Sequence, residues 1–585
     1  MFFAQAELRG DNTFLASKGP DGWDTISWNE AARRVAQIAE GLLANGVKPG
    51  DRVMIVSENR PEWCLADLGI MAAGAVSVPT YITNTERDHL HILEDSSARA
   101  AIVSTAKLTK AFLPAAYQAD NMELLVAMEP VKVGQTSGPA VRQWDDVFAG
   151  QPGDVAAARE RALQVKRDDL ACLIYTSGTG GAPRGVRQHH GAILCSTAGA
   201  YDILNEDFGV TGERFLSFLP LSHAYEHTGG QFLPIMCAAE IYYSQGLDRL
   251  AANIEETQPT IMVVVPRLFE VLRTRIMKGI EKQGGAAQWL LDQALRLGKI
   301  RQERGKIPLW EKPLDAVLER TIRKKVQGRL GGRLKALVSG GAPLNPDVGL
   351  FFESLGVTLL QGYGQTEAAP VVSCNRPAAK IKMHTVGPPL KGVEVRIAED
   401  GEIMVAGELV MHGYWNNPGE TERSLKEGWL HTGDIGHFDE DGHIVITDRK
   451  KDLIVNDKGD NIAPQRVEGM LTLQPEIQQA MVSGDKRPYL VGLVVPDEEW
   501  LAEWAPANGK SADFAELKAD PDFTRAVMGA VDRVNKTLAA TEKVRRVIIA
   551  DEAFTVENEQ MTPSLKIRRH VIRGLYQDRL DGLYR

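Results

Sequence analysis

The residues best suited to chemistry lie in a loop rich in glycine and hydroxyl groups at residues 175–186, with the sequence YTSGTGGAPRGV. The apolar run before it, LACLIY, predicts a buried strand that ends at the loop. Glycines let the backbone turn tightly and direct N–H groups at phosphate oxygens, and Thr176, Ser177 and Thr179 add hydroxyl donors. No Lys-Ser/Thr pair follows the last glycine, so the loop is not of the Walker A type. The pattern indicates a polyphosphate site, with an ordinary surface turn as the alternative.

Three further segments place polar residues directly after strand-like runs, at residues 339–344, 360–367 and 429–434. In the second, Tyr363 stands between two glycines and could stack on a base, while Glu367 could bind a hard cation such as Mg²⁺. Each feature alone also fits a turn with a packing aromatic or a capping carboxylate. Their combination with the glycine-rich loop indicates nucleotide chemistry.

The elements that must position these residues alternate between strand-like and helix-like segments. Ser27 is predicted to cap a helix that follows it, and apolar strand-like runs cover residues 52–57, 100–104, 170–175, 214–219, 260–265 and 334–339. Such alternation favours parallel α/β sheets with sites at the strand ends. From about residue 387, short strand-like pieces separated by turns predict a small barrel or meander. The charged run DRKK at residues 448–451 marks the predicted boundary between domains 1–450 and 451–585.

Composition narrows the class of protein. A chain of 585 residues is too long for one core, and 44% hydrophobic with 25% charged residues is typical of a globular protein. The net charge of -10 argues against a dedicated nucleic-acid binder. The five cysteines show no C-x-x-C spacing, and the longest apolar run is shorter than the ~20 residues of a membrane span. With no secretory signal pattern at the start, the sequence predicts a cytoplasmic protein, with peripheral membrane contact left open.

One segment departs from the acidic average. Residues 296–335 contain thirteen Lys/Arg and four Asp/Glu on segments with helical apolar spacing. This patch could touch anionic lipid or the phosphates of a charged thiol cofactor. The alternative, a solvated helix face in an acidic protein, is favoured at this stage.

Eight segments in order resemble the adenylate-forming (AMP-binding) acyl-CoA synthetase superfamily, over essentially the whole chain. They lie at residues 176–186, 219–226, 265–270, 339–344, 361–367, 432–434, 448–452 and 562–566. Residues 265–270, the basic stretch and residues 461–465 look like the long-chain fatty acid branch. The resemblance implies a large N-terminal domain of two α/β sheets plus a distorted β-barrel. A small mobile α+β C-terminal domain would follow it.

The resemblance also implies a two-step reaction with ATP, Mg²⁺ and coenzyme A. The carboxylate of a medium- or long-chain fatty acid attacks the α-phosphate of ATP, releases pyrophosphate and forms an acyl-adenylate. The thiol of coenzyme A then displaces AMP. The alternatives are an acyl-AMP ligase that delivers to another thiol, such as that of a carrier protein, and a catalytically impaired homologue that binds nucleotide or acyl-CoA.

Site roles are carried over residue by residue from the resemblance. The nucleotide residues are Thr176, Ser177, Gly178 and Thr179 on the β- and γ-phosphates, Thr366 on the α-phosphate, Tyr363 on adenine, and Asp434 and Arg449 on the ribose. Arg184 and Gly341 are further cofactor-binding residues. Glu367 and Thr176 would hold Mg²⁺, Lys566 would bridge the acyl carboxylate and the α-phosphate, and Lys451 would be the hinge. His223, Gly229 and Gly230 would line the acyl pocket, with core packing as the alternative.

Three positions depart from the family pattern. Gly180 stands where threonine is usual, Arg184 where lysine is usual, and Lys458 where a glycine lies near the thiol route. Arginine keeps the charge but changes reach and geometry. Gly459 follows Lys458 and could compensate by a shift of one residue. Acyl length and oligomeric state are not determined by the sequence.

Overall fold

The computed structural model describes residues 1–132, 138–176, 182–562 and 567–585. The predicted site residues Ser177, Gly178, Thr179 and Lys566 therefore lie outside the described residues, as does Gly180. The chain forms two compact units. Unit 1 comprises Met1–Arg396, Met404–Thr432 and Phe438–Val445, and unit 2 comprises Ile397–Ile403, Gly433–His437 and Ile446–Arg585.

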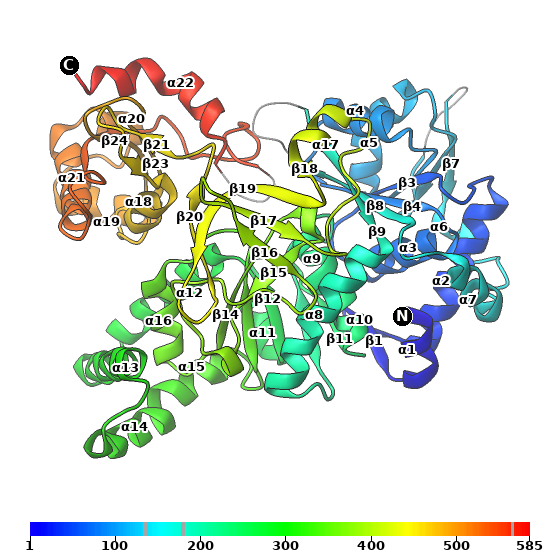
Figure 1. Ribbon diagram of the computed structural model, residues 1–585, viewed down its shortest axis with the longest axis horizontal. Coiled ribbons are helices and arrows are strands. Elements are labelled where there is room, and N and C mark those ends of the chain that lie inside the picture. Colours follow the sequence, from blue (N-terminus) through cyan, green and yellow to red (C-terminus); the bar gives the residue numbers. More distant parts are fainter. Residues whose placement is uncertain (133–137, 177–181, 563–566) are drawn as a thin grey trace. The chain divides into compact units, whose positions relative to one another are not determined.

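Unit 1 contains a seven-stranded sheet with the order β7-β6-β5-β3-β4-β8-β9 (Figure 1). Its strands are β3 (Arg52–Val56), β4 (Val76–Thr80), β5 (Ala100–Val103), β6 (Leu124–Ala127), β7 (Ala140–Gln143), β8 (Leu170–Thr176) and β9 (Arg184–His189). All neighbours are parallel except β8 and β9, which are antiparallel. Successive residues of a strand point to opposite faces, so these apolar strands need cover on both sides.

Helices cover both faces of this sheet. The helices α2 (Trp28–Ala44) and α3 (Pro61–Ala72) share one core with Val53 and Ile55, whereas α4 (Glu86–Ser96) and α5 (Ala106–Gln118) share another with Met54 and Val56. Helix α2 starts as predicted, because the Ser27 side chain accepts a hydrogen bond from the Glu30 N–H at 3.2 Å. The short helices α1 (Phe2–Arg9), α6 (Trp144–Phe148) and α7 (Val155–Gln164) complete this part.

The second large sheet of unit 1 has eight strands in the order β15-β14-β13-β12-β10-β11-β1-β2. Its strands are β1 (Thr13–Lys18), β2 (Trp23–Ser27), β10 (Arg214–Ser217), β11 (Glu240–Tyr243), β12 (Ile261–Val264), β13 (Ala336–Ser339), β14 (Leu359–Gly364) and β15 (Val371–Cys374). Only the outermost pairs, β1 with β2 and β14 with β15, are antiparallel. The carboxyl ends of the parallel strands therefore lie at one edge, which is where the polar segments follow.

The helices of this second half include a group that runs between β12 and β13. That group is α12 (Pro266–Glu281), α13 (Gly285–Arg304), η2 (Leu309–Glu311), α14 (Lys312–Leu318), η3 (Glu319–Arg323) and α15 (Lys324–Arg329). The others are α8 (His190–Phe208), α9 (Ala224–Glu226), η1 (His227–Phe232), α10 (Leu233–Met236), α11 (Leu250–Thr257) and α16 (Pro346–Ser354). A Cβ on Gly298 would lie 1.8 Å from Ser354 Oγ, so this glycine lets α13 pack closely on α16.

The short strands expected after residue 387 form a five-stranded sheet, β16-β17-β19-β18 with β20 beside β19. They are β16 (Glu394–Ile397), β17 (Glu402–Ala406), β18 (Leu425–Lys426), β19 (Trp429–Phe438) and β20 (Ile444–Arg449), and α17 (Pro418–Ser424) precedes β18.

Unit 2 is α+β. It has a two-stranded ribbon, β21 (Ile454–Val455) with β22 (Asn461–Ile462), and the three-stranded sheet β23 (Ile477–Ser483), β24 (Leu490–Pro496) and β25 (Val544–Ile549). Its helices are α18 (Pro464–Leu471), α19 (Glu498–Ala507), α20 (Phe514–Lys518), α21 (Pro521–Asn535) and α22 (Arg569–Gly582). The predicted mixed α/β architecture of several sheets is confirmed. Over the described part of the chain, no helix combines the length and apolarity needed to cross a bilayer.

Candidate active site

The two ends of the glycine-rich loop lie side by side. Thr176 ends β8 and is paired in register with Arg184, which begins β9. Thr176 Oγ1 and Arg184 Nε are both buried and have no hydrogen-bond partner among the described residues. Buried polar atoms are nearly always hydrogen-bonded, so two orphaned donors at one place indicate a polar ligand. A phosphate group would satisfy both, which fits the predicted polyphosphate site.

Arg184 is fixed by two residues that sequence reasoning did not single out. Its Nη1 forms an ion pair with Glu420 of α17, and its guanidinium lies 4.5 Å from the centre of the Tyr414 ring. Arg423 also binds Glu420, at 2.7 Å. Burial alone would raise the pKa of Glu420, but the two arginines outweigh it and hold the pKa below its usual value. Glu420 is therefore an anion beside Arg184 at neutral pH.

Backbone pairing with β9 brings these partners into place. Val186 forms a β-bridge with Tyr414, and the Trp415 N–H donates to the Gly185 carbonyl at 2.7 Å. Asn417 then caps α17 by accepting from the Glu420 N–H at 3.1 Å. The loop end, Tyr414 and Glu420 thus form one connected structure.

Tyr414 links this structure to the predicted metal ligand. Its hydroxyl donates to Glu367 Oε1 at 2.8 Å. Burial, followed by the Glu367 charge, raises the pKa of Tyr414, so the phenol keeps its proton. The Tyr414 hydrogen bond engages Oε1 of Glu367. Carboxylate oxygens suit Mg²⁺, and binding of the ion by Glu367 stays a prediction. On the neighbouring residue, the Thr366 carbonyl accepts from Gln188 Nε2 of β9 at 2.7 Å.

The glycines of this region have packing reasons of their own. A Cβ on Gly364 would lie 1.8 Å from the carbonyl oxygen of Pro370, and one on Gly340 would lie 2.8 Å from the Tyr225 ring. Gly341 has φ +80, a conformation that favours glycine. Tyr363, predicted to lie beside the base, is only 8% exposed. The backbone that leads into β15 thus leaves no room for a side chain at Gly364.

The predicted acyl-pocket residues lie on and before the π-helix η1. His223 caps α9 by accepting from the Tyr225 N–H at 3.1 Å, and Gly229 and Gly230 are buried within η1. A Cβ on Gly229 would touch Val263 at 3.0 Å, and one on Gly230 would overlap Glu226 Oε1 at 2.3 Å. Close packing explains both glycines, and lining of the acyl pocket stays a prediction. π-Helical turns are frequent at functional sites.

Buried ionisable groups beside η1 were missed by sequence reasoning. Asp67 Oδ2 of α3 accepts from His227 Nε2 at 2.9 Å and from Gln231 Nε2 at 2.7 Å, and the Asp67 and His227 side chains are fully buried. Next to them, Glu226 accepts from Ser217 Oγ at 2.6 Å, and burial raises the pKa of Glu226 to about 8. The sequence offered one signal for this cluster, which is Asp67 within the otherwise apolar part of α3.

In unit 2, the two residues predicted to bind the ribose meet. Arg449 Nε lies 3.3 Å from Asp434 Oδ1, and Asp434 is 5% exposed. Gly459 has φ +87, whereas the Lys458 N–H is bound to Asn456 Oδ1 at 2.9 Å in the same turn. The glycine conformation of this turn is therefore at residue 459, which fits a shift of one residue relative to the family pattern.

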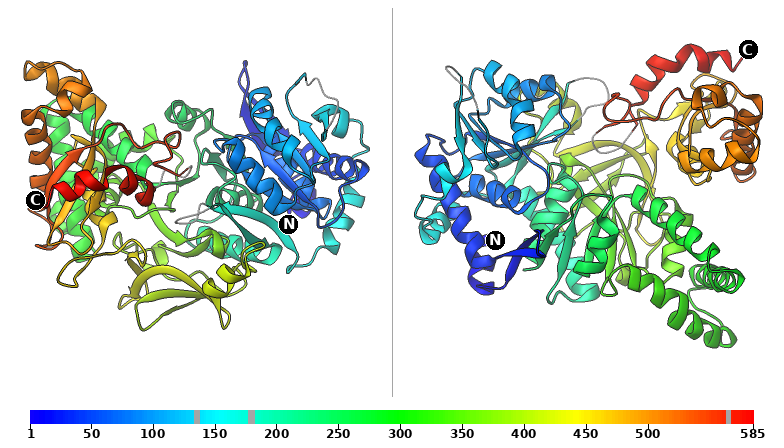
Figure 2. Two further views of the ribbon diagram at one scale, coloured as in Figure 1. Left: turned by 90° about the horizontal axis from the view of Figure 1, so that it is seen from above. Right: turned by 180° about the vertical axis from the view of Figure 1, so that it is seen from behind.

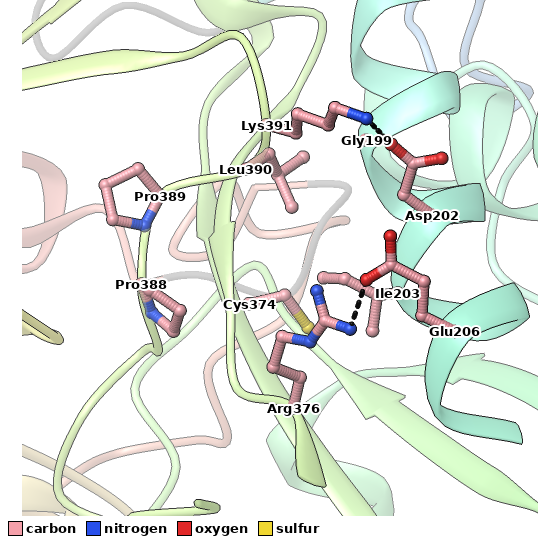
Figure 3. A pocket seen from close by; sticks show the side chains of 10 residues that line it. All are labelled: Gly199, Asp202, Ile203, Glu206, Cys374, Arg376, Pro388, Pro389, Leu390 and Lys391. Atoms are coloured by element: carbon pink, nitrogen blue, oxygen red, sulfur yellow. Dashed lines mark hydrogen bonds and ion pairs between the residues drawn. The ribbon is translucent and has the colours of Figure 1, made fainter. Parts of the chain in front are cut away.

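Two other features of the described residues lie apart from the predicted site residues. Asp168, His189 and His412 bring three ligand atoms within 4.8 Å, but the two imidazoles are stacked with an interplanar angle of 12° and His189 Nδ1 caps α8. Stacked rings cannot direct both lone pairs at one ion. A pocket between α8 and residues 374–391 contains none of the predicted site residues, and its charges pair with one another, as in Arg376 with Glu206 at 2.8 Å (Figure 3).

Comparison with known families agrees with this geometry. The family described as AMP-binding enzyme matches residues 2–415, and the AMP-binding enzyme C-terminal domain matches residues 451–585. The chain belongs to the AMP-binding enzyme family. The first match spans Thr176, Arg184, Glu367 and Tyr414, whereas Asn417 and Glu420 lie just beyond it.

Relatives of this AMP-binding enzyme are named as fatty acid ligases. The long-chain-fatty-acid–CoA ligase FadD15 of Mycobacterium bovis is 33% identical over 571 residues, covering 96% of this chain and 92% of that protein. Human long-chain-fatty-acid–CoA ligase 1 is 30% identical, covering 99% and 85%. Among solved structures, the adenylation domain of a carboxylate reductase from Mycobacterium chelonae has a TM-score of 0.76 at 21% identity, covering 100% and 90%, which shows the shared fold.

Proposed function

We propose that this AMP-binding enzyme activates a medium- or long-chain fatty acid with ATP and joins it to coenzyme A. The observation that carries the proposal is the linkage of Arg184, beside Thr176, through Tyr414 to Glu367. It connects the ends of a phosphate loop to a carboxylate suited to Mg²⁺. The choice of a fatty acid as substrate and of coenzyme A as acceptor follows the names of relatives that are 30–33% identical over nearly the whole chain.

In the first step, a carboxylate oxygen attacks the α-phosphorus of ATP, and the bond from that phosphorus to pyrophosphate breaks. Thr176 and Arg184 bind the β- and γ-phosphates through the atoms that lack partners. Thr366 binds the α-phosphate. Mg²⁺, held by Glu367 and Thr176, would neutralise phosphate charge, and Tyr414 keeps the Glu367 carboxylate in one orientation. Preorganised charges of this kind act strongly where water is excluded.

The remaining predicted residues complete the nucleotide and acyl contacts. Asp434 and Arg449 bind the ribose, and their 3.3 Å contact holds the guanidinium near the carboxylate. Tyr363 binds adenine, Gly341 completes the nucleotide site, and His223 with the η1 glycines borders the acyl chain. Lys566 offsets the negative charge that gathers on the attacking and phosphoryl oxygens.

In the second step, the sulfur of coenzyme A attacks the acyl carbon, the bond from that carbon to AMP breaks, and the thiol proton is released. We infer that residues 451–585 form a mobile domain with its hinge at Lys451, which removes Lys566 before this step. The match of a separate C-terminal family at residues 451–585 supports the boundary. Five free cysteines support a cytoplasmic, reducing setting.

The test is an assay with ATP, Mg²⁺, coenzyme A and acids of increasing chain length. The proposal expects AMP and acyl-CoA for at least one fatty acid. Acid-dependent exchange of pyrophosphate into ATP without use of coenzyme A would instead show transfer to another thiol, such as that of a carrier protein. ATP binding without any exchange would show an impaired homologue and would overturn the proposal.

A further inference from the structure

The helical group between β12 and β13 carries exposed positive charge that its own acids do not neutralise. Its four acids in residues 296–335 are all engaged locally: Glu311 with Arg296 at 2.7 Å, Asp315 with Arg301 at 3.1 Å and Arg323 at 2.8 Å, Glu319 with Arg323 at 3.2 Å, and Glu303 with Lys299 at 4.0 Å. Among the described residues of this stretch, the exposed cations that form no ion pair include five near its outer turns: Arg304, Lys306, Lys312, Arg320 and Lys324. The group is thus a cationic surface on a chain of net charge -10.

Large apolar side chains stand among these cations. Leu309 and Trp310 are adjacent in η2, are 75% and 79% exposed, and lie in sequence between Lys306 and Lys312. Such exposure of a tryptophan is uncommon, because burying an aromatic ring is strongly favourable. No described residue of unit 1 covers this pair. Figure 1 and the right-hand view of Figure 2 show α13 and α14 side by side at the periphery of unit 1.

The helices on either side extend the same surface. Trp289, 52% exposed, precedes Arg296 by seven residues, so both lie on one stripe of α13. Arg296 also links this stripe to η2, because its Nη1 donates a hydrogen bond to Glu311, the residue next to Trp310. Val317 of α14 is also exposed. The exposed cations Arg320 and Lys324 follow it three and seven residues later along the continuous turns from α14 to α15.

We propose that these residues form a lipid-docking surface that seats the enzyme on an anionic bilayer. It comprises Trp289, Leu309, Trp310 and Val317 with the cations Arg304, Lys306, Lys312, Arg320 and Lys324. Tryptophan favours the membrane–water interface, and each Lys or Arg near an anionic bilayer contributes about 1 kcal/mol of attraction. Leu309 and Trp310 insert between headgroups, and the cations bind the lipid phosphates.

Charge and size favour a bilayer over a protein partner. The exposed apolar part is a few side chains on a turn and two helices, whereas a stable protein interface buries about 800 Å² on each partner. The cations are spread over α13, α14 and α15, which matches a flat charged plane better than a single acidic side chain. Docking does not depend on the proposed activity. If that activity holds, docking would bring the enzyme to a substrate that partitions into bilayers.

Binding to vesicles in the absence of ATP and coenzyme A tests this surface. Wild-type protein should sediment with phosphatidylcholine vesicles containing about a third phosphatidylglycerol, less with phosphatidylcholine alone, and less at high salt. The double change Lys306→Gln/Lys312→Gln should lower the partition coefficient about 30-fold, since two cations are lost. Leu309→Ser/Trp310→Ser should lower it at least tenfold, and thermal unfolding would confirm that each variant is folded.

Matched controls lie elsewhere in unit 1. Lys107→Gln/Lys110→Gln removes two exposed cations of α5, and Leu163→Ser removes a side chain of α7 that is 75% exposed. Neither should change vesicle binding. Equal binding by all variants would overturn the proposal. So would a raised KM for coenzyme A in the lysine variant with vesicle binding intact, which would assign the cations to cofactor phosphates. Dissociation of an oligomer by the Trp310 variant, with vesicle binding unchanged, would show a protein interface instead.

Discussion

At the scale of single residues, Arg184 shows how a departure from the family pattern is accommodated. The Arg184 guanidinium is held in one orientation by stacking on Tyr414 and by its ion pair with Glu420. A lysine at this position would not need such orientation, because its ammonium group is a compact point charge. The unpartnered Nε of Arg184 remains for a ligand. The arrangement has an electrostatic consequence, because phosphates must approach an arginine that is already neutralised.

Replacement of Glu420 by glutamine should therefore tighten ATP binding. Removing a partly exposed anion beside the phosphate site is expected to lower the Kd for ATP about fivefold, equivalent to ~1 kcal/mol. Titration calorimetry with ATP measures this. Glu422→Gln, at an exposed position of the same helix, is the control and should leave the Kd unchanged. Weaker binding in Glu420→Gln would mean that Glu420 acts mainly by positioning Arg184.

Glu226 should make stability depend on pH. Its pKa is raised to about 8 when folded, against a usual value of 4.5, because burial penalises the charged form. The folded state then binds more protons than the unfolded state between these values, so the free energy of unfolding falls as pH rises through this window. From pH 5.5 to 7.5 the loss is about 2–3 kcal/mol. Urea unfolding of wild type and Glu226→Gln should show the loss in wild type alone; parallel pH profiles would contradict it.

At the scale of elements, some glycines lie where two strands or two helices approach closely. Gly364 lies where β14 meets β15, and Gly298 lies where α13 meets α16. In both places a side chain would collide with another element. The motif GYGQTE at residues 362–367 is therefore as much a packing motif as a binding motif.

Gly364→Ala should destabilise unit 1 and impair the site together. The added Cβ would lie 1.8 Å from a backbone oxygen, so β14 and β15 must separate, at a cost of about 1–3 kcal/mol. Glu367 lies three residues later and should shift, which lowers the rate of pyrophosphate exchange. Urea unfolding and the exchange assay measure the two effects. Gly328→Ala in α15, with no atom within 4 Å of its added Cβ, should be neutral or stabilising by up to ~1 kcal/mol.

At the scale of the whole molecule, the proposed reaction requires that the two chemical steps respond differently to one lysine. Lys566→Ala should lower acid-dependent pyrophosphate exchange by about 100-fold or more, because a charge that stabilises the transition state is lost. Transfer of the acyl group from supplied acyl-adenylate to coenzyme A should remain within a few-fold of wild type.

Rapid-quench measurement of both half-reactions checks the Lys566 prediction. Arg545→Ala, an exposed cation of β25 in unit 2, should leave both steps unchanged. Equal loss of both steps in Lys566→Ala would refute the assigned role.

Several parts of the fold and site could be predicted because their determinants are local. The apolar runs before residues 176 and 339 predict β8 and β13, and Ser27 marks the start of α2. Ordered motifs identify the family, since each is a contiguous stretch of chain. The basic composition of residues 296–335 was visible as well, but its preferred interpretation as a solvated helix face did not foresee Leu309 and Trp310 exposed beside unpaired cations.

The sequence by itself determined the α/β class, the family and the candidate phosphate, metal and ribose residues. Only the tertiary structure decided which residues support them. Arg184 and Glu420 are 236 positions apart, and Asp67 and His227 are 160 positions apart. No local pattern relates such residues, because their contact exists only after sheets and loops pack together. Sequence motifs identify candidate reactive residues, whereas tertiary packing determines which neighbours orient them, neutralise their charge or leave them exposed.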